Sequence, residues 1–487
     1  MNDAAAPAVD LDDIQGLLRF GYARHVEGCF LLLRVSDRAA ARAWLATAPV
    51  ASAVAQRPPP PAVLQVALSS AGMRALAVPE AVIDGFSVEF VAGMSGNPSR
   101  ERRLGDIGGN DPGGWAWGSG SQVPHVLLLL YAVPDALADW QRGIEDGAAR
   151  GFDVIARLPA RFSQTEPFGF ADGLSQPTID WQRTRPARDA EREDYTNLAC
   201  LGEFVLGYPN EYGAYTDRPL LDPQGPAAAL PRAEDAPERA DLGRNGSYLV
   251  LRQLQQDVGG FWHALTQRAG GDAARGRAIA EAMVGRRMNG EPLAAESSPA
   301  RIEGNDADDA RNAFTYRDDP LGLRCPLGAH VRRANPRNAD LPPGAPGFIS
   351  WAERTLGFDA GALARDLVAS TRFHRLLRRG RAYGEAGAAD QGIHFISLNA
   401  SIGRQFEFVQ AAWISGAHFD GLSGESDPLL GHRVAACDGS ATDAFTIPQP
   451  GGASQRLDAL PRFVVVRGGA YFFLPGIRAL RVLAALA

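Results

Sequence analysis

One aspartate lies between two glycines and beside aromatic residues, in the segment Phe-Gly-Phe-Ala-Asp-Gly-Leu-Ser-Gln-Pro over residues 168–177. Glycine lets the backbone approach a flat ligand closely and adopt a positive φ, so Gly169 and Gly173 would leave Asp172 projecting from a turn. A carboxylate that projects among apolar neighbours is suited to carrying a proton during a reaction. An Asp-Gly pair is also common in ordinary turns, and this segment alone favours that simpler interpretation.

A single histidine lies among small residues and precedes three arginines, in the segment Cys-Pro-Leu-Gly-Ala-His-Val-Arg-Arg-Ala-Asn-Pro-Arg over residues 325–337. A lone histidine is more often structural than a ligand, but the arginines would suit an anionic cofactor beside a metal. No second His or Cys stands at ligand spacing, so a bare zinc or copper site is poorly supported. A cofactor that supplies its own four equatorial nitrogens needs one protein ligand, and haem is that cofactor. His330 is therefore a candidate ligand of haem iron.

A third segment alternates basic and apolar residues, His-Arg-Leu-Leu-Arg-Arg-Gly-Arg-Ala-Tyr-Gly over residues 374–384. Its simplest interpretation is a solvated basic face that ends at a glycine. Leu376 and Leu377 between the arginines indicate instead a strand or turn edge that buries at least one guanidinium.

Together the three segments resemble the dye-decolourising peroxidases. That family carries a G-x-x-D-G motif, matched by residues 169–173, and a histidine segment similar to A-H-x-R-x-x-N-P-R, matched by residues 329–337. Its arginine segment, which ends in an aromatic residue and glycine, is matched by residues 378–384. Further similarity lies in residues 13–16 and 392–410. Three motifs in the family's chain order make coincidence improbable.

The resemblance implies a haem-dependent peroxidase that uses hydrogen peroxide to oxidise dyes, phenolics or other bulky reductants. The oxidation would proceed in one-electron steps through an iron-oxo porphyrin intermediate. One haem b (iron protoporphyrin IX) per chain would be bound through His330 on the iron. Asp172 would carry a proton between the peroxide oxygens, and Arg378 would stabilise the developing negative charge. Further contacts to the cofactor would come from Arg337, Arg332, Phe395, Ile393 and Gly173.

The choice of the distal arginine rests on spacing. The insertion between His330 and Arg378 is longer than in shorter members of the family, so Arg375 and Arg379 also compete. The distance along the chain to Tyr383-Gly384 favours Arg378.

Two features near the expected haem stay open. Carboxylates next to a ligating imidazole orient it, and both Asp427 and Glu407 are candidates to face the far nitrogen of His330. The direction of His394 is also open: because successive side chains of a strand point to opposite faces, His394 faces either the haem or the other side of the sheet. Ile393 stands where the family usually has leucine.

These residues need a scaffold, and we predict an α+β fold of two ferredoxin-like domains, with antiparallel sheets covered by helices and haem held between sheet and helices. The N-terminal third alternates strand-like and helix-like segments twice over. We expect strands at 29–35, 63–68, 126–133 and 152–158, and helices at 37–47, 79–94 and 134–148.

The second half is expected to repeat this composition. We predict strands at 247–251 and 393–398, a helix at 260–286 broken near Gly270, two strands within 463–474 about the turn at Gly468-Gly469, a helix through Gln410 and a closing helix at 478–487. The domains would be 1–190 with the distal aspartate, an irregular connection at 191–244, and 245–487 with the histidine and the distal arginine.

Composition excludes several classes of protein. Of 487 residues, 45% are hydrophobic and 22% charged, and the net charge is −7 with no basic run, so nucleic acid is not an expected partner. The longest apolar run, Val126–Val133, is too short to span a bilayer. The four cysteines are far apart, which disfavours iron–sulfur and thioredoxin-like sites. The N-terminal residues lack the features of a secretion signal, and we expect a cytoplasmic protein whose oligomeric state the sequence leaves open.

Two other functions compete. A haem-handling protein of the same fold, a carrier or an iron-releasing enzyme, would not need Asp172 and Arg378, which peroxide cleavage requires. A haem-free interaction module would use His330 and its arginines to bind an acidic partner, and would leave the glycine-flanked aspartate without a purpose.

Overall fold

The N-terminal sheet has the strand order β4-β1-β3-β2, with every neighbouring pair antiparallel. This is the ferredoxin-like order that the alternation of strands and helices predicts, and the strand limits agree with the prediction to within a few residues. The sheet and its two main helices comprise β1 (Glu27–Val35), α1 (Arg38–Thr47), β2 (Ala62–Leu68), β3 (Val126–Ala132), α6 (Leu137–Ala148) and β4 (Phe152–Arg161).

Both faces of this sheet are buried. Leu31 and Leu33 of β1 enter a core with Leu45 of α1 and Ile144 of α6. The alternating residues, Phe30 and Leu32, enter a second core on the opposite face. Because successive side chains of a strand point to opposite faces, burial on both sides explains why the sequence shows continuous apolar runs here.

The C-terminal sheet is built around β9, which pairs antiparallel with β12 on one edge and β15 on the other. Two short strands extend it by pairing with the far edge of β12. Its strands are β9 (Ser247–Gln256), β10 (Leu377–Arg378), β11 (Arg381–Tyr383), β12 (Gly392–Asn399) and β15 (Val464–Leu474).

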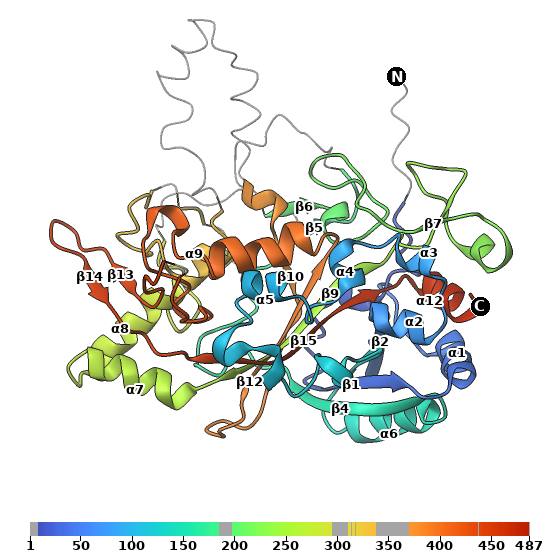
Figure 1. Cartoon of the computed structure of the whole chain (residues 1–487), viewed down its shortest axis with the longest axis horizontal. Coiled ribbons are helices and arrows are strands. Elements are labelled where there is room, and N and C mark those ends of the chain that lie inside the picture. The colour runs from blue at the N-terminus through green and yellow to red at the C-terminus, as the bar shows by residue number, and fades with distance from the viewer. Residues whose placement is uncertain are drawn as a thin grey trace, which may run out of the picture.

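The two sheets meet at two narrow seams. Phe473 of β15 pairs with Leu68 of β2, and Ala382 of β11 pairs with Arg161 of β4. Since β9 also pairs with β12, the nine strands close on themselves. Helices α1, α2 (Ser70–Ala75), α6 and α12 (Ile477–Ala485) gather at one end of the molecule (Figure 1). At the other end lie α7 (Val258–Arg268), α8 (Ala273–Val284) and the hairpin of β13 (Phe445–Ile447) and β14 (Gln455–Leu457).

The remaining elements are short. They include α2 (Ser70–Ala75), α5 (Pro98–Leu104), β5 (Thr178–Asp180), β6 (Leu198–Cys200), β7 (Leu220–Leu221), β8 (Ala240–Asp241), α7 (Val258–Arg268), α8 (Ala273–Val284), α9 (His330–Ala334), β13 (Phe445–Ile447), β14 (Gln455–Leu457), α12 (Ile477–Ala485) and the π-helical segments Gly403–Glu407 and Val409–Ile414. The break between α7 and α8 confirms the prediction near Gly270, whose φ is 71°. The computed structural model describes residues 8–184, 197–294, 310–312, 314–316, 318–337, 370–436 and 438–486.

Two predicted elements are wrong. The helix expected at 79–94 is two short helices, α3 (Glu80–Ile83) and α4 (Val88–Ala92), because the Ser87 side chain caps a new helix by accepting from the Phe90 N–H. Residues 464–474 form one strand rather than two. Its register shifts between Val466 and Gly468, and a Cβ on Gly468 would lie 2.4 Å from the Trp117 ring. The glycine therefore permits a close approach instead of a turn.

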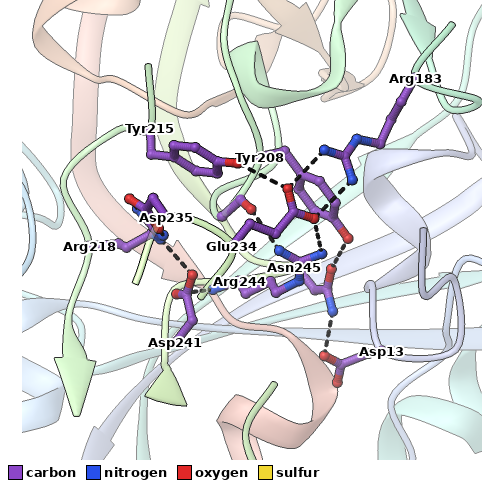
Figure 2. A network of polar contacts seen from close by, with 11 residues as sticks. Asp13, Arg183, Tyr208, Tyr215, Arg218, Glu234, Asp235, Asp241, Arg244 and Asn245 are labelled. Atoms are coloured by element: carbon purple, nitrogen blue, oxygen red, sulfur yellow. Dashed lines mark hydrogen bonds and ion pairs between the residues drawn. The ribbon is translucent and has the colours of Figure 1, made fainter. Parts of the chain in front are cut away.

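In the described part of the connection between the two sheets, residues 197–244, the strands are two or three residues long, and a polar network holds this segment (Figure 2). Arg183 donates two 2.8 Å hydrogen bonds to the Glu234 carboxylate, and Arg244 donates a third at 2.7 Å. The Tyr208 hydroxyl donates to Asn245, whose amide donates to Asp13. Charged hydrogen bonds thus fix a segment of low hydrophobicity. The insertion between His330 and Arg378 lies mostly outside the described residues, and the proposed domain limits stay a prediction.

No helix in the described parts of the chain is both long enough and apolar enough to cross a membrane.

Candidate active site

A cavity of about 540 Å³ lies against the C-terminal sheet, on the face that also carries the helical segments after β12. Leu254 of β9, Phe395 of β12 and Val464 of β15 contribute apolar walls. Phe406 and Ile414, from the π-helical segments, contribute further apolar surface. Residues from all three sequence motifs line this cavity. It lies between the C-terminal sheet and the helical segments, where the sequence predicts the haem.

His330 is the first residue of α9 and lines the cavity. Its Nδ1 lies 2.9 Å from Oδ2 of Asp427. The other carboxylate oxygen of Asp427 accepts from the backbone N–H groups of Leu429 and Leu430, at 2.9 and 2.8 Å. A carboxylate held in this way fixes the ring so that Nδ1 carries the proton and Nε2 is left to bind a metal.

Asp427 is fully buried. Burial by itself raises the pKa of this carboxyl group, but the contacts with His330 and the Leu430 N–H, together with the charge of Arg333, lower it below its ordinary value. The structure also decides between the two carboxylates that the sequence left open. Glu407 accepts from Tyr471 at 3.0 Å and pairs with Arg100 at 2.8 Å, so it serves another part of the core.

The three arginines that follow His330 have different surroundings. Arg333 donates to the carbonyl oxygens of Trp413 and Gly416, at 2.6 and 3.0 Å, and so ties α9 to the π-helical segment. Arg337 lines the cavity and is held over the Phe314 ring at 3.7 Å.

Arg332 is not brought to the cavity. Its guanidinium donates to the carbonyl oxygens of Asp319 and Cys325, at 2.9 and 3.0 Å, and is 1% exposed. The expectation that Arg332 contacts the cofactor is therefore not supported, because its side chain points from α9 into a loop rather than toward the cavity.

Asp172 and Arg378 face one another in the cavity, with Oδ1 and Nη1 3.8 Å apart and both side chains partly exposed to it. Gly169 and Gly173 have φ values of 99° and 80°, the left-handed backbone that the motif predicts. The Asp172 Oδ1 accepts from the Gly173 N–H at 2.6 Å, so the glycine also orients the carboxylate.

The segment after Gly173 holds the arginine as well. The Arg378 N–H donates to Oε1 of Gln176 at 3.0 Å, and Arg378 Nη2 donates to the carbonyl of Ser175 at 3.3 Å. One turn of chain thus positions both polar groups. Gln176 was not singled out from the sequence, although it lies in the quoted motif.

The competing arginines are directed elsewhere. Arg375 donates to the Leu198 carbonyl at 3.4 Å, and Arg379 donates through Nε to the Leu17 carbonyl at 3.0 Å. The geometry favours Arg378 as the partner of Asp172, as the spacing predicts.

Strand alternation places Ile393 and Phe395 on the cavity wall and His394 on the opposite face. The His394 Nε2 lies 3.1 Å from the Pro159 carbonyl and its ring stacks on Tyr383. Burial lowers the pKa of His394 to about 4. His394 is therefore a neutral, structural histidine.

A second histidine, which the sequence did not mark, lines the cavity. His374 packs its ring on Phe408 with centroids 3.7 Å apart, and Nδ1 lies 2.5 Å from the Arg404 carbonyl. Burial lowers its pKa to about 4. Its place in the arginine-rich segment was the one available signal.

The residues fit haem better than a bare metal ion. Among the described residues, no group of three His, Cys, Asp or Glu side chains could hold a metal ion. The cavity instead offers one imidazole with its Nδ1 occupied and apolar walls for a flat macrocycle. Arg337 on its lining adds positive charge, while its guanidinium donates to the carbonyl oxygens of Asn312 and Phe314. A cofactor with four nitrogens and two carboxylates of its own suits this donor set.

Comparison with known proteins agrees. No family model matches the chain. The multifunctional dye peroxidase DyP2 of an Amycolatopsis species is 30% identical over 391 residues, which cover 74% of this chain and 71% of that protein. The dye-decolorizing peroxidase msp1 of Mycetinis scorodonius is 27% identical over 507 residues, 98% of this chain and 88% of that protein.

Solved structures share the fold. A DyP-type peroxidase of Anabaena has a TM-score of 0.68 at 22% identity and aligns over 97% of this chain and 94% of its own. The decolorizing peroxidase of Auricularia auricula-judae has a TM-score of 0.69 at 23% identity, over 98% and 100% of the two chains.

The protein is thus a peroxidase with a ferredoxin-like α+β fold. It belongs to the dye-decolourising peroxidase family, whose members are haem enzymes. As a peroxidase it uses hydrogen peroxide and a reducing substrate. The family prediction is confirmed, and neither a haem carrier nor a haem-free interaction module is needed to explain the cavity.

Proposed function

We propose that one haem b per chain occupies the cavity, with Nε2 of His330 as its axial ligand and with Arg337, Ile393, Phe395 and the backbone at Gly173 in contact with it. The single observation that carries this proposal is that one cavity receives both a carboxylate-held imidazole, His330, and the Asp172–Arg378 pair. Bound haem would supply the two electrons that cleavage of the O–O bond of peroxide needs, and the oxidised haem would then take electrons from the reducing substrate.

The residues around it divide the remaining work. Asp172 takes the proton from one oxygen of hydrogen peroxide on its carboxylate and returns it to the other oxygen, which leaves as water. Arg378 places its guanidinium beside the oxygen on which negative charge develops. Asp427 keeps the proton on Nδ1 of His330 and so makes Nε2 a stronger donor.

The reducing substrates we propose are dyes, phenolics or other bulky reductants, oxidised by one electron at a time. The names of the relatives, a dye peroxidase and a dye-decolorizing peroxidase, support this class.

The test is the visible absorption spectrum of protein supplied with haemin during expression, before and after one equivalent of hydrogen peroxide. We expect a Soret band that corresponds to one haem b per chain and changes rapidly on adding peroxide. In His330→Ala the native spectrum should be lost. A Soret band that ignores peroxide would overturn the role of Asp172 and Arg378, and a native spectrum in His330→Ala would overturn the ligand assignment.

A further inference from the structure

The nine residues that end at Arg378 form the arm that presents it to the cavity. We call residues 370–378 the distal arm. It contributes Thr371, His374, Arg375 and Leu376 to the cavity wall in addition to Arg378. Only Leu377 and Arg378 belong to a sheet, through two pairs with β12. The position of the arm therefore depends on contacts outside the sheet.

Two neighbouring residues of the π-helical segment hold the backbone of the arm. Arg404 donates through Nη1 to the Phe373 carbonyl at 2.9 Å. The Arg404 carbonyl lies 2.5 Å from Nδ1 of the His374 ring, with which it forms a hydrogen bond. Gln405 donates through Nε2 to the Arg375 carbonyl at 2.8 Å. Three successive residues of the arm are thus fixed by Arg404 and Gln405.

Both of these residues are in turn held by Glu203. The fully buried Glu203 carboxylate faces the Arg404 guanidinium, at 2.9 Å from Oε2 to Nη2 and 3.2 Å from Oε1 to Nη1. Its backbone carbonyl accepts from the Gln405 amide at 3.0 Å. A two-point carboxylate–guanidinium contact specifies orientation as well as distance.

A second carboxylate, Glu211, also links Glu203 to the distal arm. Glu211 pairs with Arg372 of the arm at 3.5 Å, and its N–H donates to Oε1 of Glu203 at 2.9 Å. The ring of Tyr212 stacks on Phe373 with centroids 4.0 Å apart. Residues from the connection between the sheets therefore contact the arm at two consecutive positions, Arg372 and Phe373.

We propose that Glu203 is a positioning residue for peroxide cleavage: through Arg404 and Gln405 it fixes the distal arm, and thereby sets where the Arg378 guanidinium lies relative to Asp172. This inference rests on the proposed function, because it requires Arg378 to act on peroxide. Glu203 itself does not line the cavity.

The charges at this position support a role beyond simple packing. Burial raises the pKa of Glu203 to about 7; Arg404 opposes that change and Glu211 adds to it. Two carboxylates buried together cost stability unless cations hold them. Arg404 and Arg372 are those cations: Arg404 donates to the arm, and Arg372 belongs to it.

The test is Glu203→Gln in haem-loaded protein. The rates are measured at about pH 8, above the pKa of Glu203, so that the wild-type carboxylate is ionised. The substitution keeps Oε1 as an acceptor but replaces the charged oxygen with an amide N–H that faces another donor, so Arg404 loses its anion. A misplacement of about 1 Å can cost about 100-fold in rate. We expect the second-order rate constant for peroxide, measured by stopped-flow, to fall by roughly 10- to 100-fold, with haem content and the rate of reduction by the second substrate retained.

A double-mutant cycle separates positioning from general damage. If Glu203 acts through Arg378, Glu203→Gln should slow the peroxide reaction in the wild type and add little in an Arg378→Leu background. The matched control is Asp241→Asn. Asp241 is an equally buried carboxylate that pairs with Arg218 at 2.6 Å (Figure 2), and it does not line the cavity. Its loss should lower the thermal midpoint without changing the peroxide rate.

Each outcome bears on one claim. An unchanged peroxide rate in Glu203→Gln would overturn the positioning role, and so would an equal slowing in both backgrounds. The rate of the Arg378→Leu single variant still tests the proposed function by itself. If Arg378→Leu does not slow the reaction, the proposed function fails and the inference fails with it. Should Glu203→Gln not accumulate with haem, Glu203→Asp, which keeps the charge but shortens the side chain, is measured in the same two backgrounds against the same criteria.

Discussion

Oδ1 of Asp172 lies 3.8 Å from Nη1 of Arg378, and a single stretch of chain, from Gly173 to Gln176, holds both residues. The pair is too far apart for a tight hydrogen bond. Because they are not locked together, the guanidinium and the carboxylate each keep a face open to the cavity. They are still close enough to act on one small molecule.

Asp172→Asn should slow the reaction with peroxide by about 10²–10⁴-fold, the usual contribution of a group that transfers a proton. The amide keeps the shape of the side chain but cannot accept and return the proton. Stopped-flow absorption at the Soret band measures the rate. Asp153→Asn, at an exposed position on β4, is the matched control and should react as the wild type does. A near-normal rate in Asp172→Asn would transfer the proton-carrying role to another group.

Arg378→Leu should slow the same step by about 10²–10³-fold, since one aligned donor to developing negative charge is worth about that much. Arg378→Lys should lie between the leucine variant and the wild type, because lysine restores the charge but not the planar pair of donors. If the lysine and leucine variants react at the same rate, orientation of the donors rather than charge dominates. If both react normally, Arg378 has no part in the step.

Asp427→Asn should weaken the hold on haem or lower activity by about 10–100-fold, as is usual when the carboxylate behind a metal-binding histidine is lost. A less basic Nε2 on His330 stabilises the ferric state less, so the reduction potential should rise. A spectroelectrochemical titration measures it. Glu407→Gln is the matched control, because Glu407 pairs with Arg100 and Tyr471 instead of the histidine. If Asp427→Asn and Glu407→Gln have the same reduction potential, Asp427 does not tune the haem through His330.

Asp106 should make stability depend on pH. Its carboxylate forms a buried ion pair with Arg252. Burial raises the pKa of Asp106 from its ordinary 3.8 to about 6, despite the opposing charge of Arg252. The folded state therefore keeps a proton that the unfolded state has lost between these pH values, and the free energy of unfolding falls as the pH rises from about 4 to about 6.

Asp106→Asn removes that titration. Thermal melts from pH 4 to pH 8 should show the variant's deficit in midpoint to be largest near pH 4 and smaller above pH 6. Asp153→Asn should show no such trend. A deficit that grows with pH would mean that the attraction to Arg252 outweighs the cost of burying the carboxylate.

The sequence alone determined what depends on local patterns. Apolar runs and their spacing gave the strands of the N-terminal sheet, since a strand buried on both faces must be apolar throughout. Glycines on either side of Asp172 indicated a turn with positive φ, and both have it. The segment around His330 pointed to haem because a single imidazole suits only a cofactor that brings its other ligands.

Tertiary structure decided what depends on long-range contacts. Asp427 was chosen over Glu407 by packing that joins residues 97 positions apart. Local pattern does not encode which of several neighbouring arginines points into the cavity. The sequence therefore placed Arg332 at the cofactor, whereas its side chain is buried against a loop outside the cavity lining. Gly468 likewise has the local pattern of a turn, but in the folded protein it is a glycine because the Trp117 ring packs against it. Periodicity fixes which face of an element is buried, but only the packed molecule fixes which other segment covers that face, and at this site the covering segments supply the chemistry.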